Sequence, residues 1–135
     1  FSRSGATDKA DSFDTVASLQ AIVTDDIDSA RNMVKPMLAL YIGGMGAKGK
    51  NFYNDLACRY GYGEAAAKIQ DLYLSGKKME EVGSVPDAFV DELALIGTKE
   101  MIRDRLEAWN ESSATTLALM PTDSNTLRTV AELVL

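Results

Sequence analysis

The sequence contains no histidine and a single cysteine, Cys58, among its 135 residues. Without histidine the chain cannot by itself form a Ser-His-Asp triad, and with one cysteine it lacks the ligands of the common zinc sites. One cysteine cannot form an internal disulfide, which favours a reducing, cytoplasmic compartment. We interpret Cys58 as a small, buried residue of a helix.

Basic residues and long apolar runs are also scarce. Fourteen Lys and Arg stand against 20 Asp and Glu, which gives a net charge of -6. This balance argues against general binding to nucleic acid, because phosphate contacts need a basic surface. No apolar run approaches the roughly 18 residues of a membrane span, and the N-terminus does not resemble a signal peptide. We therefore expect neither a nucleic acid nor a membrane as partner.

Two short apolar segments predict β-strands, one over Thr15–Thr24 and one over Ala114–Met120. Both are apolar without clean alternation, which is typical of strands that are buried on both faces of a parallel sheet. The first stops at Asp25-Asp26, which we interpret as the cap of the next helix. Long helical connections between the two segments predict parallel pairing.

Most of the remaining residues predict helices, with boundaries set by glycine, proline and capping residues. Pro36 falls inside the first of them and predicts a kink or break. Residues 1–14 are polar and are interpreted as a lead-in or severed linker, and residues 15–135 as the folded part, with a helical insertion over about 42–97. The expected helices span 27–41, 51–60, 64–74, 78–82, 86–95, 99–110 and 124–135.

A glycine-rich loop separates the first two expected helices. Gly44 to Gly49 matches the G-x-G-x-x-G pattern of dinucleotide sites, and its extension to Lys50 nearly matches a P-loop. Both motifs need a strand directly before the loop, whereas a helix precedes it here. Asn51 also lacks the hydroxyl with which a P-loop binds Mg²⁺. The sequence therefore predicts no nucleotide site at this loop.

Two interpretations of this segment stay open. It is either a helix-to-helix turn with solvated lysines, or a lid whose cations meet an anionic substrate or cofactor. The turn that follows the second strand is a further candidate contact, because barrel active sites lie at the C-terminal ends of the strands. The candidate contacting residues are Lys48, Lys50, Asn51, Arg59, Met120 and Thr122. We interpret the aromatic residues at helical spacings, such as Tyr41, Tyr60 and Phe89, as core.

Two parallel strands cannot make a stable sheet alone, because each leaves the N–H and C=O groups of one edge unpaired. Further strands must therefore come from elsewhere. A (β/α)8 barrel takes about 250 residues, so about half of one would be missing. The chain also opens on Phe1 rather than Met, which suggests a start inside a longer reading frame.

Two blocks of sequence resemble the luciferase-like monooxygenase superfamily, particularly its coenzyme F420-dependent oxidoreductases. One is VKPMLALYIGGMGAKGKNFYNDLACRYGYGEAAAKIQDLY over residues 34–73, and the other is VDELALIGTKEMIRDRLEAWNES followed by ATTLAL. The resemblance covers roughly residues 13–135. The sequence departs from the family at one place: Ser112-Ser113 stands where members commonly have a glycine before the last strand. Because a glycine that ends a helix is usually left-handed, we expect a left-handed conformation at Ser113.

The resemblance implies an α/β fold: the C-terminal part of a TIM barrel, mostly helical with two short parallel strands that are the seventh and eighth of the barrel. It also implies hydride transfer between a deazaflavin and a small organic substrate, with coenzyme F420 held mainly by the absent N-terminal part. No catalytic residue can be carried over, and the chain alone is expected to be nearly inactive and to associate as a homo-oligomer. An FMN-dependent monooxygenase and a non-catalytic helical binding module are the alternatives.

Overall fold

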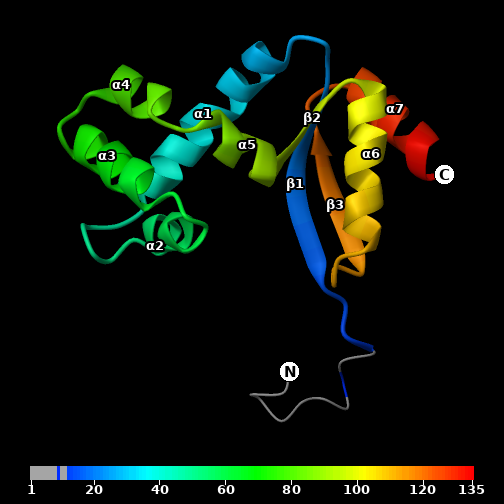
Figure 1. Ribbon diagram of the computed structural model, residues 1–135, viewed down its shortest axis with the longest axis horizontal. Coiled ribbons are helices and arrows are strands. Elements are labelled where there is room, and N and C mark those ends of the chain that lie inside the picture. The colour runs from blue at the N-terminus through cyan, green and yellow to red at the C-terminus, as the bar shows by residue number, and fades with distance from the viewer. Residues whose placement is uncertain (1–8, 10–11) are drawn as a thin grey trace.

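The structure is a computed structural model that describes residue 9 and residues 12–135. Ten elements follow one another along the chain (Figure 1). They are β1 (Val16–Val23), α1 (Ile27–Gly44), α2 (Phe52–Arg59), α3 (Gly63–Leu74), α4 (Lys78–Gly83), α5 (Asp87–Leu93), β2 (Ala94–Gly97), α6 (Lys99–Asn110), β3 (Thr116–Pro121) and α7 (Ser124–Val134).

The sheet has three parallel strands in the order β2-β1-β3. The parallel pairing predicted for the two apolar segments is confirmed, with Leu19 opposite Leu119 in the β1–β3 ladder. The prediction of only two strands is wrong, because Ala94–Gly97 forms a third strand where the sequence predicted the end of a helix. Ala and Leu favour helix in isolation, but pairing with Gln20–Val23 buries all four residues of β2.

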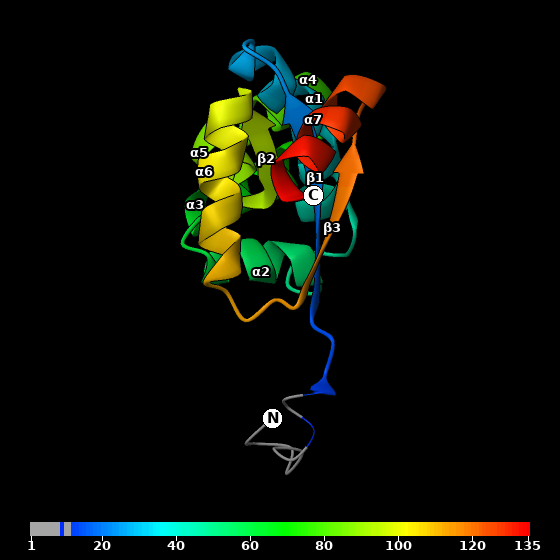
Figure 2. The same ribbon diagram turned by 90° about the vertical axis from the view of Figure 1, so that its right-hand side faces the viewer.

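Helices cover both faces of this sheet. On the face that we call the α6 face, Leu19 and Ala21 of β1 pack with Ile102 of α6 and Val130 of α7. On the opposite face, the α1 face, Ile22 of β1 packs in one cluster with residues of α1 and α5. Figures 1 and 2 show α6 and α7 on one side of the strands and the helices α1 to α5 on the other.

The strand order explains why the helices lie on opposite faces. The chain moves from β1 to β2 in one direction across the sheet and then from β2 back past β1 to β3. Right-handed crossovers in opposite directions place their helices on opposite faces. A (β/α)8 barrel instead pairs consecutive strands and carries helices only outside. The described residues thus form a three-stranded parallel sheet whose order differs from that of consecutive barrel strands.

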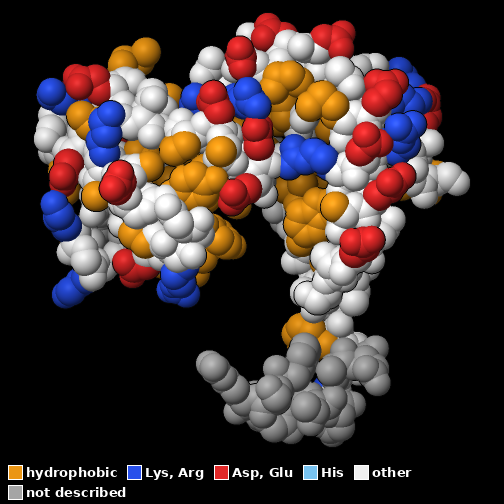
Figure 3. All heavy atoms as spheres, viewed as in Figure 1, with side chains coloured by type: hydrophobic (Ala, Val, Ile, Leu, Met, Phe, Trp, Pro, Cys, Tyr) orange, Lys and Arg blue, Asp and Glu red, His pale blue; other side chains and the backbone are white. Residues whose placement is uncertain are grey.

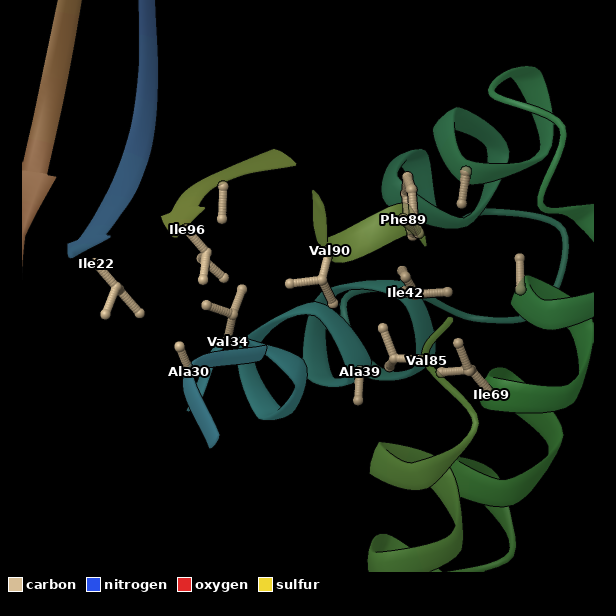
Figure 4. Packing of buried hydrophobic residues seen from close by; sticks show 13 residues of the cluster. Ile22, Ala30, Val34, Ala39, Ile42, Ile69, Val85, Phe89, Val90 and Ile96 are labelled. Atoms are coloured by element: carbon tan, nitrogen blue, oxygen red, sulfur yellow. The ribbon is translucent and has the colours of Figure 1, made fainter. Parts of the chain in front are cut away.

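Residues from α1 to α5 form a helical lobe with its own core, continuous with the α1 face of the sheet (Figure 4). Val34 and Ile42 of α1 lie in it beside Ile69 of α3 and Val90 of α5. Ion pairs reinforce the contact of α1 with α5, since Lys35 Nζ lies 2.6 Å from Asp87 Oδ1. The lobe therefore stands as a folded body to one side of the strands.

Two local expectations are wrong, and a third is wrong in part. Of the kink or break predicted at Pro36, the break does not occur, because α1 runs from Ile27 to Gly44 through it. Cys58 is exposed rather than buried, because it lies on the outer side of α2 while Ala57 turns inward. Ser113 is not left-handed: within the described residues, positive φ angles occur only at glycines. The turn before β3 is instead closed by a hydrogen bond from the Ala114 N–H to the Ser112 hydroxyl, 3.1 Å.

Candidate functional site

Asn51 is the most constrained of the candidate contacting residues. Its side chain is almost fully buried, and its amide nitrogen donates to the carbonyls of Tyr41, at 3.1 Å, and Ile42, at 2.9 Å. Its amide oxygen accepts from the N–H groups of Tyr53, at 2.9 Å, and Asn54, at 3.2 Å. Both donors and both acceptor positions of the amide are therefore used, and Asn51 ties the end of α1 to the start of α2.

The glycine-rich loop is shaped by close packing rather than by a ligand motif. A Cβ atom at Gly46 would lie 2.5 Å from the Lys50 carbonyl oxygen, and one at Gly44 would lie 2.4 Å from Cζ of Tyr73. At Gly46 the obstacle is backbone, so only glycine fits there, whereas a side chain at Gly44 would have to displace the Tyr73 ring. As the sequence predicted, the loop follows a helix, α1, and not a strand.

The cations of this segment are exposed and do not converge. Lys48 pairs with Asp71 of α3 at 2.7 Å, with both side chains mostly in solvent. Lys50 is exposed in the loop and Arg59 is exposed at the end of α2. Met120 and Thr122 lie elsewhere, at the C-terminal end of β3 on the other half of the molecule (Figure 1). The structure does not bring these two groups of candidates together.

The C-terminal edge of the sheet carries the N-termini of three helices. Asp26 caps α1 by accepting from the Ser29 N–H at 3.1 Å, and Asp123 caps α7 by accepting from the Thr126 N–H at 2.8 Å. Hydrogen bonds from Ser29 lower the pKa of Asp26, and the Thr126 N–H is the main cause of the lowered pKa of Asp123. The capping role predicted for Asp25-Asp26 is confirmed at Asp26. Such carboxylates are stabilised in the charged form, so they are poor proton donors.

Thr126 links two elements at the same edge. Its buried hydroxyl accepts a hydrogen bond from the Val23 N–H at 3.1 Å. The Thr122 N–H in turn donates to the Ala21 carbonyl at 3.3 Å. These contacts join the start of α7 to the end of β1. Thr122 therefore contributes its backbone to the sheet, and its hydroxyl lies 3.1 Å from Asp123 Oδ2.

An open cleft of about 510 Å³ lies between the helical lobe and the part of β1 around Ser18. Figure 3 shows apolar side chains gathered along this hollow between the two halves of the molecule. Its polar groups are the hydroxyls of Ser18 and of three tyrosines, and no charged side chain lines it. The wall residues are Ser18 from β1, Met37, Leu38, Tyr41 and Ile42 from α1, Tyr53, Leu56, Ala57 and Tyr60 from α2 and its C-cap, and Phe89 and Leu93 from α5.

The aromatic walls of the cleft pack against one another. Tyr41 and Tyr53 meet edge to face with ring centroids 4.6 Å apart, and Tyr60 lies 6.3 Å from Phe89. Tyr41, Tyr60 and Phe89 were expected to be core, and only Phe89 is fully buried. The seven-residue spacing of Tyr53 and Tyr60, with Leu56 between them, indicates one apolar face of a short helix. That spacing was the available signal for the cleft.

Other kinds of site find little support in the described part of the chain. Its Cys, Asp and Glu residues form no group that could hold a metal ion. None of its helices has the length and apolar character needed to span a bilayer. The cleft can shield a small apolar or aromatic group from water, but it brings no acid or base to that group.

The luciferase-like monooxygenase family matches residues 2–116 of this sequence. The chain belongs to this family. A protein of Mycobacterium tuberculosis whose name describes a coenzyme F420-dependent oxidoreductase is 34% identical over 134 residues, which is 99% of this chain and 39% of that protein. The chain thus spans about two fifths of the length of this relative. No solved structure is significantly similar to the chain.

The described residues do not by themselves fit a deazaflavin or flavin. The cleft offers aromatic walls for a ring system, but an anionic tail needs cationic or N–H partners, and no cation lines the cleft. Lys48 of the neighbouring loop is already paired with Asp71. At the three helix N-termini of the sheet edge, backbone N–H groups already donate to the capping side chains of Asp26, Thr98 and Asp123.

Proposed function

We propose that this chain is part of an F420-dependent oxidoreductase of the luciferase-like family, which transfers hydride between the deazaflavin and a small organic substrate. The observation that carries this proposal is the 34% identity, over 99% of the chain, to a relative that bears this name. In the full-length protein we place the chain's strands in a (β/α)8 barrel, in which β2 would pair between β1 and β3 and the helices would all lie outside. The active site would lie at the C-terminal ends of the strands.

Within this function, the residues of the chain itself shape the protein and shield a bound group, and they carry out no chemical step. Its cleft is lined by apolar and aromatic side chains and excludes water from whatever it covers. The bound cofactor would supply the hydride chemistry, and its site would be built mainly by residues outside this chain, since the residues here do not fit it. Lys48, Lys50, Arg59, Met120 and Thr122 stay candidates for contacts that the rest of the protein completes.

Cofactor titration of the full-length protein tests the proposal. F420 is added to the protein while its absorbance and fluorescence are followed, and the titration is repeated with FMN. We expect saturable F420 binding that an excess of FMN does not displace. Tighter binding of FMN would support the FMN-dependent monooxygenase instead, and binding of neither cofactor would support a non-catalytic module.

Two further properties belong to the same proposal. A single cysteine that is exposed suits a reducing cytoplasm, and the open strand edges of β2 and β3 suit self-association. Sedimentation of the purified chain checks the second property: we expect oligomers whose size grows with concentration, and a monomer at all concentrations would contradict it.

A further inference from the structure

The N-terminal half of β1 is uncovered on the α1 face. Ile22, near the end of the strand, is buried under α1, whereas Ser18 lines the open cleft and Val16 is 53% exposed. On the α6 face, Leu19 and Ala21 are buried. A strand of a parallel sheet is normally covered by helices along both of its faces. The cleft therefore marks a place where one layer of cover is missing.

The surface around the cleft is apolar well beyond its walls. Met33, Met37 and Leu40 follow one another at helical spacing on the solvent side of α1, with exposures of 63%, 42% and 43%. Met37 also lines the cleft, so this strip and the cleft form one surface. Helix α1 is thus apolar on its buried side and on part of its exposed side. A contiguous exposed apolar surface of this kind marks an interaction site.

We propose that the cleft is the docking site of an amphipathic helix from the part of the full-length protein that lies outside this chain. The inference rests on the barrel of the proposed function and on the 39% of the relative's length that the chain spans. In that barrel β3 would pair with β2 and leave its edge of β1 to the preceding strand. The right-handed crossover from that strand would bring its helix over the α1 face beside α1. The occupant needs an apolar face for Met37 and Tyr60 and no charge toward the cleft.

Fragment association tests this proposal directly. The part of the Mycobacterium tuberculosis relative that this chain does not match is produced alone, and its affinity for the chain is measured by calorimetry. Met37→Glu and Tyr60→Glu place a charge in the cleft at exposed positions, so we expect each to weaken association at least tenfold. Met79→Glu, at an 86% exposed position of α4, is the matched control and should bind like the unaltered chain. Circular dichroism melts confirm that all three variants fold.

A photo-reactive residue at position 37 identifies the occupant, and the expected cross-link joins it to a helix of the added part. Three results would overturn the docking site: equal binding by the cleft and control variants, a cross-link between two copies of this chain, or no association where the relative's own two parts do associate. A separate measurement of F420 binding by the two associated parts distinguishes this proposal from the proposed function. If the two parts associate through the cleft but do not bind F420, the proposed function is contradicted and the docking site is not. If they bind F420 and Met37→Glu does not weaken their association, the docking site is contradicted and the proposed function is not.

Discussion

Arg31 of α1 binds both carboxylate oxygens of Asp91 of α5, with Nε 3.0 Å from Oδ1 and Nη2 2.7 Å from Oδ2. The side chain of Arg31 is only about a quarter exposed, and the neighbouring carboxylates, Asp91 first, raise its pKa. Such a two-point contact fixes orientation as well as distance. It holds α5, and the strand β2 that follows it directly, against the long helix α1.

Asp91→Asn should therefore destabilise the helical lobe. Loss of a well-aligned, partly exposed pair costs about 1 kcal/mol of the free energy of unfolding. Chemical denaturation at neutral pH, and again at high salt, measures this loss. Asp104→Asn removes an exposed pair between sequence neighbours, Arg103 and Asp104, and should change the stability little. Equal effects of both substitutions would show that the Arg31 contact has no special weight.

Asn51→Ala should be more damaging. The substitution leaves the carbonyls of Tyr41 and Ile42 and the N–H groups of Tyr53 and Asn54 without their side-chain partner. Buried groups left unpaired, together with the lost helix cap, cost about 2 kcal/mol or more. Thermal unfolding of the variant checks this, with the exposed Asn110→Ala as control. A melting temperature unchanged by Asn51→Ala would free this residue for a direct role in binding.

The elements that could be predicted from the sequence are those with strong local signals. The helices predicted to begin at residues 99 and 124 do begin there and are capped by Thr98 and Asp123. The helices predicted to end at residues 60 and 74 are followed by Gly61 and Gly76, whose φ angles are 92° and 73°. Pairing of β1 with β3 followed from two apolar segments joined by helices. These features depend on residues close in the chain, or on burial that the composition of one segment reveals.

Other features depend on contacts between distant residues and left no local signal. Residues 94–97 become a strand only because Gln20–Val23 lie beside them. The position of β1 between β2 and β3 cannot be read from any single segment. In the same way, Asn51 looked like a possible ligand contact because it follows a glycine loop, and only the fold shows that its amide is fully used.

Glu81 makes the stability of the helical lobe depend on pH. Its carboxyl is buried in the lobe, and one of its oxygens would meet a Cβ atom placed on Gly43 at 3.1 Å. Burial raises the pKa of Glu81 above its usual 4.5, an effect that Lys78 opposes in part. The folded state then holds this proton more tightly than the unfolded state, so the stability that Glu81 contributes is fully present below pH 4.5 and is lost as pH rises through the raised pKa.

Glu81→Gln removes this dependence. We expect the variant to be more stable than the unaltered chain at pH 7, with the difference shrinking toward pH 4, in urea unfolding followed by circular dichroism. Glu80→Gln is the control, because Glu80 is mostly exposed and pairs with Lys77 at 3.5 Å. A pH profile that is the same for Glu81→Gln and Glu80→Gln would contradict the role of the buried carboxyl.

The order of the strands can be tested with pairs of cysteines in a Cys58→Ser background. Gln20 is the register partner of Met120 on one side and of Ala94 on the other. Neighbouring strands lie about 4.8 Å apart, within reach of a disulfide, whereas strands separated by a third lie about 10 Å apart, beyond it. The chain with Gln20→Cys and Met120→Cys should therefore form an internal disulfide on oxidation, and the chain with Ala94→Cys and Met120→Cys should not. If the second pair closes and the first does not, β2 lies between β1 and β3 as in a barrel, and the central position of β1 is wrong.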